Sequence, residues 1–216
     1  MKKNLFYKIF LWMFIGLLVT FITAYVVSLN EVMVRNIFSG ITRYILIIAE
    51  LGIGIFLGVR VWKLKPATAT CLFLFYTFLT GLTFSSIFIV YKITSIMFVF
   101  GIAALLFGIF AILGRILKLD LTKISTFLLM MLIGVMVLGI VNMFIGSSML
   151  TTVISCVSLV VFLGFVAYDI NRMKEMVGYS GDKEQNLAIL GAFSLYIDFI
   201  NIFIDLLNLF GGNSRD

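Results

Sequence analysis

Long uninterrupted runs of apolar residues constrain this chain more than any other feature of its sequence. A helix that crosses the hydrocarbon core of a bilayer needs about 20 consecutive apolar residues. Seven such runs, with short connections, use nearly the whole sequence. Only 12% of the 216 residues are charged, whereas a soluble domain carries about 25%. The sequence therefore predicts an all-α integral membrane protein, a seven-transmembrane-helix bundle in a single transmembrane domain over residues 1–216 with no sizeable soluble domain.

The predicted helices cover residues 9–29, 44–62, 67–91, 93–117, 124–145, 149–170 and 187–210. The first run follows lysines, as a secretion signal does, but its 21 residues exceed the usual 7–15-residue signal core. We interpret it as a retained first helix.

The basic residues predict the orientation in the membrane, because cytoplasmic loops carry an excess of Lys and Arg. One side, with the N-terminus and every second connection, holds twelve of them, and the other side holds Arg35, Arg43, Lys92 and Arg215. This places the N-terminus in the cytoplasm and the C-terminus outside, in the cell (plasma) membrane. The net charge of +6 is dispersed over short loops, which does not indicate a nucleic-acid partner.

Missing residue types exclude several kinds of chemistry. The chain has no histidine, which serine proteases of the Ser-His type and His-ligated zinc or haem sites require. It has no Asp-Asp-x-x-Asp motif, and the last run has no lysine that could form a Schiff base. We therefore expect neither an enzyme nor a resident cofactor. Cys71 and Cys156 lie inside apolar runs and are interpreted as small buried hydrophobic residues.

Four acidic residues, Glu50, Asp169, Asp198 and Asp205, fall inside the apolar runs. An ionised carboxylate at the middle of a membrane costs roughly 2.5–3.5 kcal/mol on insertion scales. Acidic residues in such places usually face the interior of the bundle and mark a path for ions or protons. These four are therefore the candidate functional residues.

The last run carries two of these acids in a periodic polar stripe. Ser194, Asp198, Asn201, Asp205 and Asn208 recur at steps of 4, 3, 4 and 3 residues, which places them on one face of a helix. An ion pathway is one interpretation of this face. An amphipathic helix lying flat on the membrane is a second, although such helices are usually basic on their polar face. A structural polar network between helices is a third.

Asp169 and Asp198 are predicted to approach one another. If the sixth helix continues to about residue 177 and the seventh begins near residue 184, the two form a hairpin and the depths of the acids differ by only about 7 Å. Two close carboxylates in a poorly solvated site cannot both ionise cheaply, so they would share one proton. Such a pair is a proton switch built without histidine.

Several segments carry a family resemblance that covers almost the whole chain: Thr80-Gly81-Leu82-Thr83-Phe84-Ser85, Lys118-Leu119-Asp120-Leu121, Ala167-Tyr168-Asp169, and residues 192–203 with Ala192-Phe193-Ser194 and Asp198. Through them the sequence resembles the Bax inhibitor-1 family, in its bacterial form. The resemblance implies that helix 7 is central and wrapped by the other six. It also implies a pH-sensitive calcium leak that an aspartate pair holds closed.

The resemblance also assigns roles to single residues. Asp169 and Asp198 match the aspartate pair, which would sense pH, form the gate and contact calcium, while Glu50 matches an acid of the family's second helix. Arg60 is the candidate gate partner at the cytoplasmic end of that helix, and Lys63 is a weaker one. Asp205 is an additional acid that, with Asn201, could extend the ion pathway.

Three hypotheses for function follow. The leading one is a calcium-permeable leak channel gated by protonation of Asp169 and Asp198, with calcium as a permeant or transiently bound ion. The second is a proton-coupled cation transporter or exchanger, which would show saturable flux in fixed ratio to protons. The third is a non-transporting regulator of other membrane proteins, such as a membrane-bound protease, which would co-purify with its partner. The sequence does not assign an oligomeric state.

Overall fold

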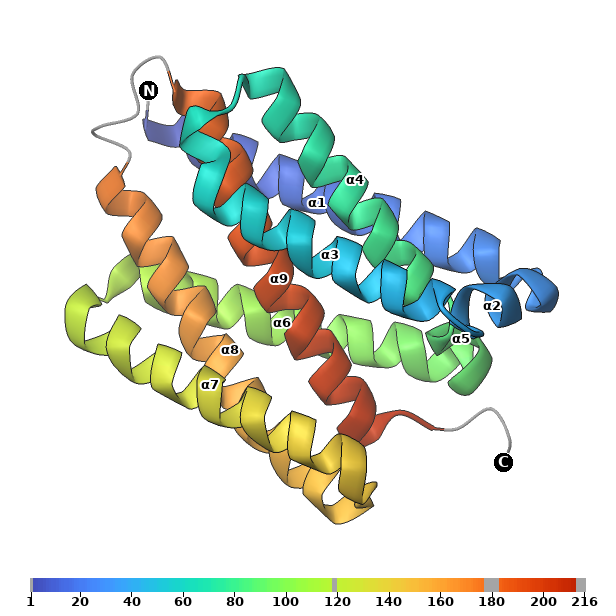
Figure 1. Ribbon diagram of the computed structural model, residues 1–216. Helices are drawn as coiled ribbons and strands as arrows, with labels where there is room; N and C mark the ends of the chain where they lie inside the picture. The colour runs from blue at the N-terminus through green and yellow to red at the C-terminus, as the bar shows by residue number, and fades with distance from the viewer. Residues whose placement is uncertain (1, 118–119, 177–182, 213–216) are drawn as a thin grey trace. The chain divides into compact units, whose positions relative to one another are not determined.

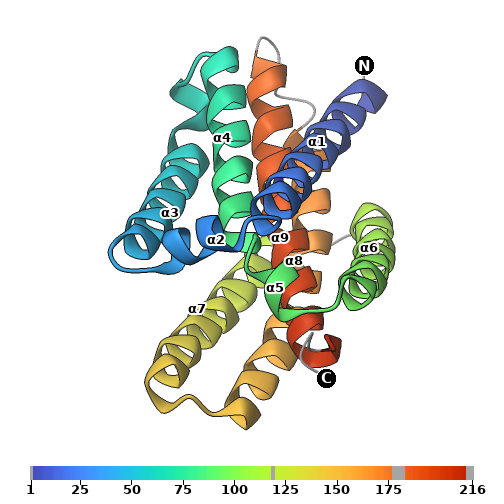
Figure 2. The ribbon, with the colours of Figure 1, turned by 90° about the vertical axis from the view of Figure 1, so that its right-hand side faces the viewer.

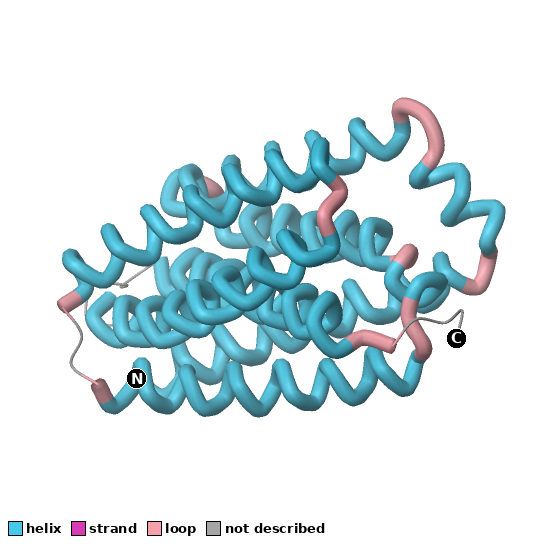
Figure 3. Tube along the Cα trace, turned by 90° about the horizontal axis from the view of Figure 1, so that it is seen from below, coloured by secondary structure: helices cyan, strands magenta, loops and turns pink. Residues whose placement is uncertain are grey.

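The computed structural model describes residues 2–117, 120–176 and 183–212, and every regular element in these ranges is a helix (Figure 3). Seven helical segments are long and apolar enough to cross a membrane: Leu5–Ser28, Thr42–Lys63, Pro66–Val90, Ile93–Ile116, Lys123–Ile145, Ser148–Met176 and Glu184–Phe210. The prediction of an all-α membrane protein with seven spans is confirmed.

In chain order (Figure 1), the helices are α1 (Lys2–Ser28), α2 (Glu31–Phe38), α3 (Thr42–Arg60), the 3-10 turn η1 (Val61–Lys63), α4 (Pro66–Phe84), α5 (Ile87–Val90), α6 (Ile93–Ile116), α7 (Leu121–Ile145), α8 (Ser148–Met176) and α9 (Glu184–Phe210).

The described chain divides into two units. The first unit comprises residues 2–91 and 183–196, and the second comprises residues 92–117, 120–176 and 197–212. Helix α9 therefore contributes its first half to one unit and its second half to the other. It is also the most buried span, with 67% of its most apolar window buried against 6–39% for the other six.

In the first unit, α4 packs against both α1 and α3 (Figure 1). Small residues allow this close approach. A Cβ atom added at Gly81 of α4 would lie 2.6 Å from Cβ of Thr23 and 2.9 Å from the carbonyl oxygen of Thr20, both on α1. Such small-residue contacts are the usual means by which helices associate in membranes.

In the second unit, α8 packs against both α6 and α7 (Figure 2). Glycines again mark the contacts. A Cβ atom at Gly114 of α6 would collide with the backbone of Ala167 on α8, and one at Gly164 of α8 would lie 2.8 Å from Leu128 on α7. These two contacts fix α8, and with it Asp169, between its neighbours.

Two features of the first unit differ from the prediction. Helix α2 was not predicted, because its eight residues are too short and too polar to register as a span; the side chain of Asn30 caps its N-terminus by accepting from Met33 N–H. The predicted helix over residues 67–91 breaks at Ser85. The hydroxyls of Ser85 and Ser86 donate to the carbonyls of Leu82 and Thr83, and such side-chain bonds compete with the helical pattern.

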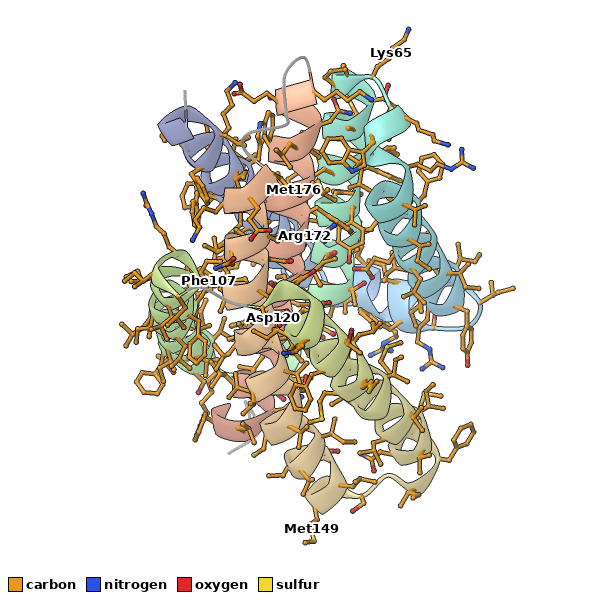
Figure 4. All side chains as sticks on the ribbon, turned by 90° about the vertical axis from the view of Figure 1, so that its left-hand side faces the viewer. Lys65, Phe107, Asp120, Met149, Arg172 and Met176 are labelled. Carbon is orange, nitrogen blue, oxygen red and sulfur yellow. The ribbon has the colours of Figure 1, made fainter. Side chains whose placement is uncertain are left out.

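Two further expectations also differ. Helix α8 continues to Met176, six residues past its predicted end at Ile170, because a helix can extend beyond its apolar run once polar side chains find partners. Figure 4 shows Met149 and Met176 at opposite ends of this long helix. The prediction that Cys71 and Cys156 are buried was wrong, since both are exposed free thiols.

Candidate ion site

The second unit brings Asp169 of α8 and Asp198 of α9 together. Both carboxyl groups are buried, with exposed fractions of 8% for Asp169 and 4% for Asp198, and Asp169 acts electrostatically on Asp198. The Oδ2 atom of Asp198 is fully buried and has no hydrogen-bond partner in the described part of the chain. A buried carboxylate oxygen in this situation is costly when ionised.

The position of Asp169 along α8 is fixed by contacts on either side of it. Asn171 donates from Nδ2 to the carbonyl oxygens of Gly114 (3.0 Å) and Leu117 (2.7 Å), which caps the C-terminal end of α6. Two residues before Asp169, the backbone of Ala167 lies so close to Gly114 that no side chain fits at position 114. Asp169 therefore sits on a rigid part of the helix.

Aromatic rings of α6 flank the Asp198 segment. Phe100 and Phe107 pack edge-on against Phe199, with ring centroids 5.3 and 5.7 Å apart, and Phe100 also contacts Phe203. These contacts join the second half of α9 to α6 through apolar surface.

Asp205 lies two turns further along α9, in a polar cluster of its own. Its exposed fraction is 6%, and those of Ser155 and Ser158 on α8 are 2% and 6%. The side chains of both serines interact with the Asp205 carboxyl group, and Asn208 donates to Oγ of Ser155 (3.3 Å). The Oδ2 atom of Asp205 is buried without a hydrogen-bond partner among the described residues.

Asn201 lies between these two acids on the α9 stripe and is half-buried. Its Nδ2 donates to the carbonyl oxygen of Ile197 in its own helix at 2.8 Å. Its amide is thus held close to the α9 backbone.

The remaining predicted site residues, Glu50 and Arg60, lie in the first unit. Glu50 is half-buried on α3 and accepts a hydrogen bond from Thr83 Oγ1 of α4 at 2.9 Å. Arg60 is the last residue of α3 and is exposed. The engagement of the aspartate pair by Arg60 stays a prediction.

The sequence analysis missed the polar partners that other helices supply. These partners are Ser155 and Ser158 in the second unit and Thr83 in the first. The first unit also buries a chain of hydroxyl groups. Thr20 Oγ1 donates to the carbonyl oxygen of Thr77 (2.9 Å) and so accepts from the Tyr196 hydroxyl (2.6 Å). Ser155 and Ser158 carried a weak signal, because their spacing of three places both on one helix face.

The described residues include no group of three or more His, Cys, Asp or Glu side chains that could hold a metal ion. Calcium usually takes six to eight oxygen ligands, several of them carboxylates.

Comparisons with known proteins agree with this picture of an all-α membrane protein. The family model described as "Inhibitor of apoptosis-promoting Bax1" matches residues 2–215. The chain belongs to the Bax inhibitor-1 family. Inner membrane protein YbhL of Escherichia coli K12 is 36% identical over 209 residues, covering 94% of this chain and 89% of YbhL.

Two further relatives of this Bax inhibitor-1 protein align over nearly their full length. An uncharacterized protein of Borreliella burgdorferi is 37% identical over 219 residues, covering all of this chain and 94% of the relative. An uncharacterized protein of Deinococcus radiodurans is 37% identical over 207 residues, which cover 95% of this chain and 88% of the relative. The Bax inhibitor-1 chain is thus a multi-pass membrane protein, and its E. coli relative is an inner membrane protein by name.

Proposed function

We propose that this Bax inhibitor-1 protein is a pH-sensitive, calcium-permeable leak channel gated by the Asp169–Asp198 pair. One observation carries the proposal: Asp198 is buried in a membrane span, its Oδ2 atom has no hydrogen-bond partner among the described residues, and another carboxyl group, Asp169, acts on it electrostatically. Such an arrangement costs stability, and residues this costly within a span usually serve ions or protons.

The pair would work as a latch between α8 and α9. While the two carboxyl groups share one proton, a hydrogen bond joins the helices. Loss of that proton replaces the bond with repulsion between two buried charges, so the two protonation states favour different packings of α8 against α9. The contacts that fix Asp169 on α8 support this role, because repulsion between the two charges would then displace α9 and not α8.

The pathway for calcium would follow the polar stripe of α9, with Asn201 and Asp205 along it and Glu50 on α3 as a further acid. Carboxylate and carbonyl oxygens suit calcium, and conduction requires sites weak enough to release the ion. We propose no resident cofactor and no enzymatic activity. The bilayer, calcium and protons are the proposed partners.

Charges within each unit support the proposed orientation, with the N-terminus cytoplasmic and the C-terminus outside, in the plasma membrane. In the first unit, Lys8 pairs with Glu184 (2.8 Å) and Lys183 donates to the carbonyl of Trp62. In the second unit, Lys174 donates to the carbonyl of Arg115. Basic residues from separate connections thus meet at one end of each unit, which is the pattern of a cytoplasmic face.

Calcium flux into liposomes containing the purified protein, measured from pH 6 to pH 8, tests the proposal. The wild-type flux should vary with pH. Asp198→Asn should give a flat profile at the level that the wild type shows at its acidic limit, because Asn is isosteric with the protonated acid. Asp169→Asn should also flatten the profile. Glu175→Gln, a change of an exposed acid on α8, is the matched control and should keep the wild-type profile.

Other results of the flux experiment would contradict the channel proposal and favour a different function. Wild-type pH dependence in both Asn variants would refute the gate. Saturable flux that moves protons in fixed ratio would identify a transporter or exchanger. No flux above protein-free liposomes, with co-purification of another membrane protein such as a protease, would identify a regulator.

A further inference from the structure

The cluster around Asp205 has a chemistry that the proposed gate does not use. Asp205, Ser155 and Ser158 are each more than nine-tenths buried, and they come from two helices of the same unit, α8 and α9. The cluster contains one carboxyl group and two hydroxyl groups that interact with it. It is therefore a compact set of oxygen atoms inside a membrane span.

One atom of this cluster lacks a partner. The Oδ2 atom of Asp205 is buried and makes no hydrogen bond in the described part of the chain, although two serine side chains lie near the carboxyl group. No ion pair with Asp205 is seen among the described residues either. A buried carboxylate needs compensation by a charge or by hydrogen bonds, and a bound cation would supply it.

We propose that Asp205, Ser155 and Ser158 form a binding site for a monovalent cation, Na⁺. The site carries at most one negative charge, which one Na⁺ neutralises. A divalent ion would leave a net positive charge in a medium of low dielectric constant, and calcium prefers several carboxylates. When Na⁺ binds, the serine hydroxyl hydrogens turn away and their oxygen lone pairs face the ion.

The cluster lies near one end of the two helices that form it. Asp205 precedes the end of α9 by five residues and Ser155 follows the start of α8 by seven, which places both about 8–10 Å from that end. Figure 4 marks the same end of α8 by Met149. Asn208 is exposed and donates to Ser155, so its amide lies between the cluster and the end of the helix.

The site would bind Na⁺ whether or not the protein conducts calcium, and the two proposals can therefore fail separately. Thermal unfolding of the full-length protein in detergent, with NaCl replacing choline chloride at constant ionic strength, measures the binding. A ligand that binds only the folded state raises the melting temperature in a saturable way. We expect such a rise for the wild type.

Variants locate the effect. Asp205→Asn should abolish the Na⁺-dependent rise. The double variant Ser155→Ala/Ser158→Ala retains the carboxyl group and should raise the half-maximal Na⁺ concentration by about tenfold or more, as expected for the loss of about 1.4 kcal/mol or more of ligand interaction. It also keeps the test decisive if Asp205→Asn does not fold. Glu175→Gln, at an exposed position, should keep the wild-type response.

Three results would overturn the proposal. The first is the absence of any difference between NaCl and choline chloride for the wild type. The second is a full Na⁺ response in Asp205→Asn or in the serine double variant. The third is a larger stabilisation by calcium that Asp205→Asn abolishes, since this would identify a divalent site.

Discussion

At the scale of single residues, Asp198 combines deep burial with incomplete hydrogen bonding. Its Oδ2 atom has no hydrogen-bond partner within the described ranges, and a second carboxyl group, Asp169, acts on it electrostatically. The native protein thus retains an arrangement that works against its own stability. Such strain is expected where a side chain serves function, because a residue selected only for packing would be apolar or fully hydrogen-bonded.

Replacing Asp198 with Asn should therefore stabilise the protein. Asn keeps the shape, removes the charge and can donate to Asp169, and the gain should be about 1–3 kcal/mol, the usual cost of an unsatisfied buried polar group. Unfolding by denaturant at neutral pH measures it. Glu175→Gln, at an exposed position, should change the unfolding free energy by less than about 0.5 kcal/mol. A less stable Asp198→Asn protein would show that the ionised acid is well accommodated.

Asn171 should be among the most sensitive polar positions of the second unit. Its two hydrogen bonds to the end of α6 are buried (to Gly114) and part-buried (to Leu117), and Asn171→Ala would leave two carbonyl oxygens without partners at a cost of about 2–4 kcal/mol. Thr152→Ala, at an exposed position on the same helix, is the control and should be nearly neutral. The comparison uses the same denaturant unfolding, and equal effects of the two changes would contradict the assigned role of Asn171.

At the scale of helices, the contact between α6 and α8 depends on one glycine. A methyl group at Gly114 would meet the backbone of Ala167, which cannot yield as a flexible side chain does. Gly114→Ala should therefore separate the helices and destabilise the protein by about 3 kcal/mol or more. It should also disturb the pH profile of calcium flux, because Asp169 lies two residues from Ala167.

Gly108 provides the matched control for this change. It lies in the same helix, and an added Cβ atom there meets nothing within 4 Å. Gly108→Ala should be neutral or stabilising by up to about 1 kcal/mol, since Ala has the higher helix propensity. If both alanine variants unfold alike, the close approach of α6 to α8 is not a determinant of stability.

Some features of the helices could be predicted from the sequence, and others could not. The seven spans were predictable because the bilayer imposes a minimum apolar length, and the acidic face of α9 was predictable because helical periodicity is local. The break at Ser85 and the helix α2 were missed, because they depend on serine hydroxyls and a cap by Asn30. The apolar run alone ended α8 too early, at residue 170, whereas the continuation to about residue 177 that the predicted hairpin assumed is close to the observed end at Met176. Ser155, Ser158 and Thr83 were missed as partners of acids, because only tertiary packing decides which helices meet.

At the scale of the whole molecule, an odd number of spans predicts that the two termini lie on opposite sides of the membrane. With the N-terminus in the cytoplasm, seven crossings place the C-terminus outside, and removal of the last span returns the chain end to the cytoplasm. A C-terminal fusion of the full chain to alkaline phosphatase should therefore be active, and the same fusion to green fluorescent protein should be dark. Fusions after Met176, which follow six spans, should show the reverse.

These paired fusions test the helix count and the orientation together, because each error gives its own pattern. If the whole chain were inverted, both fusion sites would exchange their signals. If α9 did not cross the membrane and lay on its surface, the two sites would report the same side. That second pattern would remove Asp198 and Asp205 from the membrane interior, and with them the physical reason to expect a gate or a cation site on α9. Opposite signals, with phosphatase activity at the C-terminus, are the result that the charge distribution and the seven spans require.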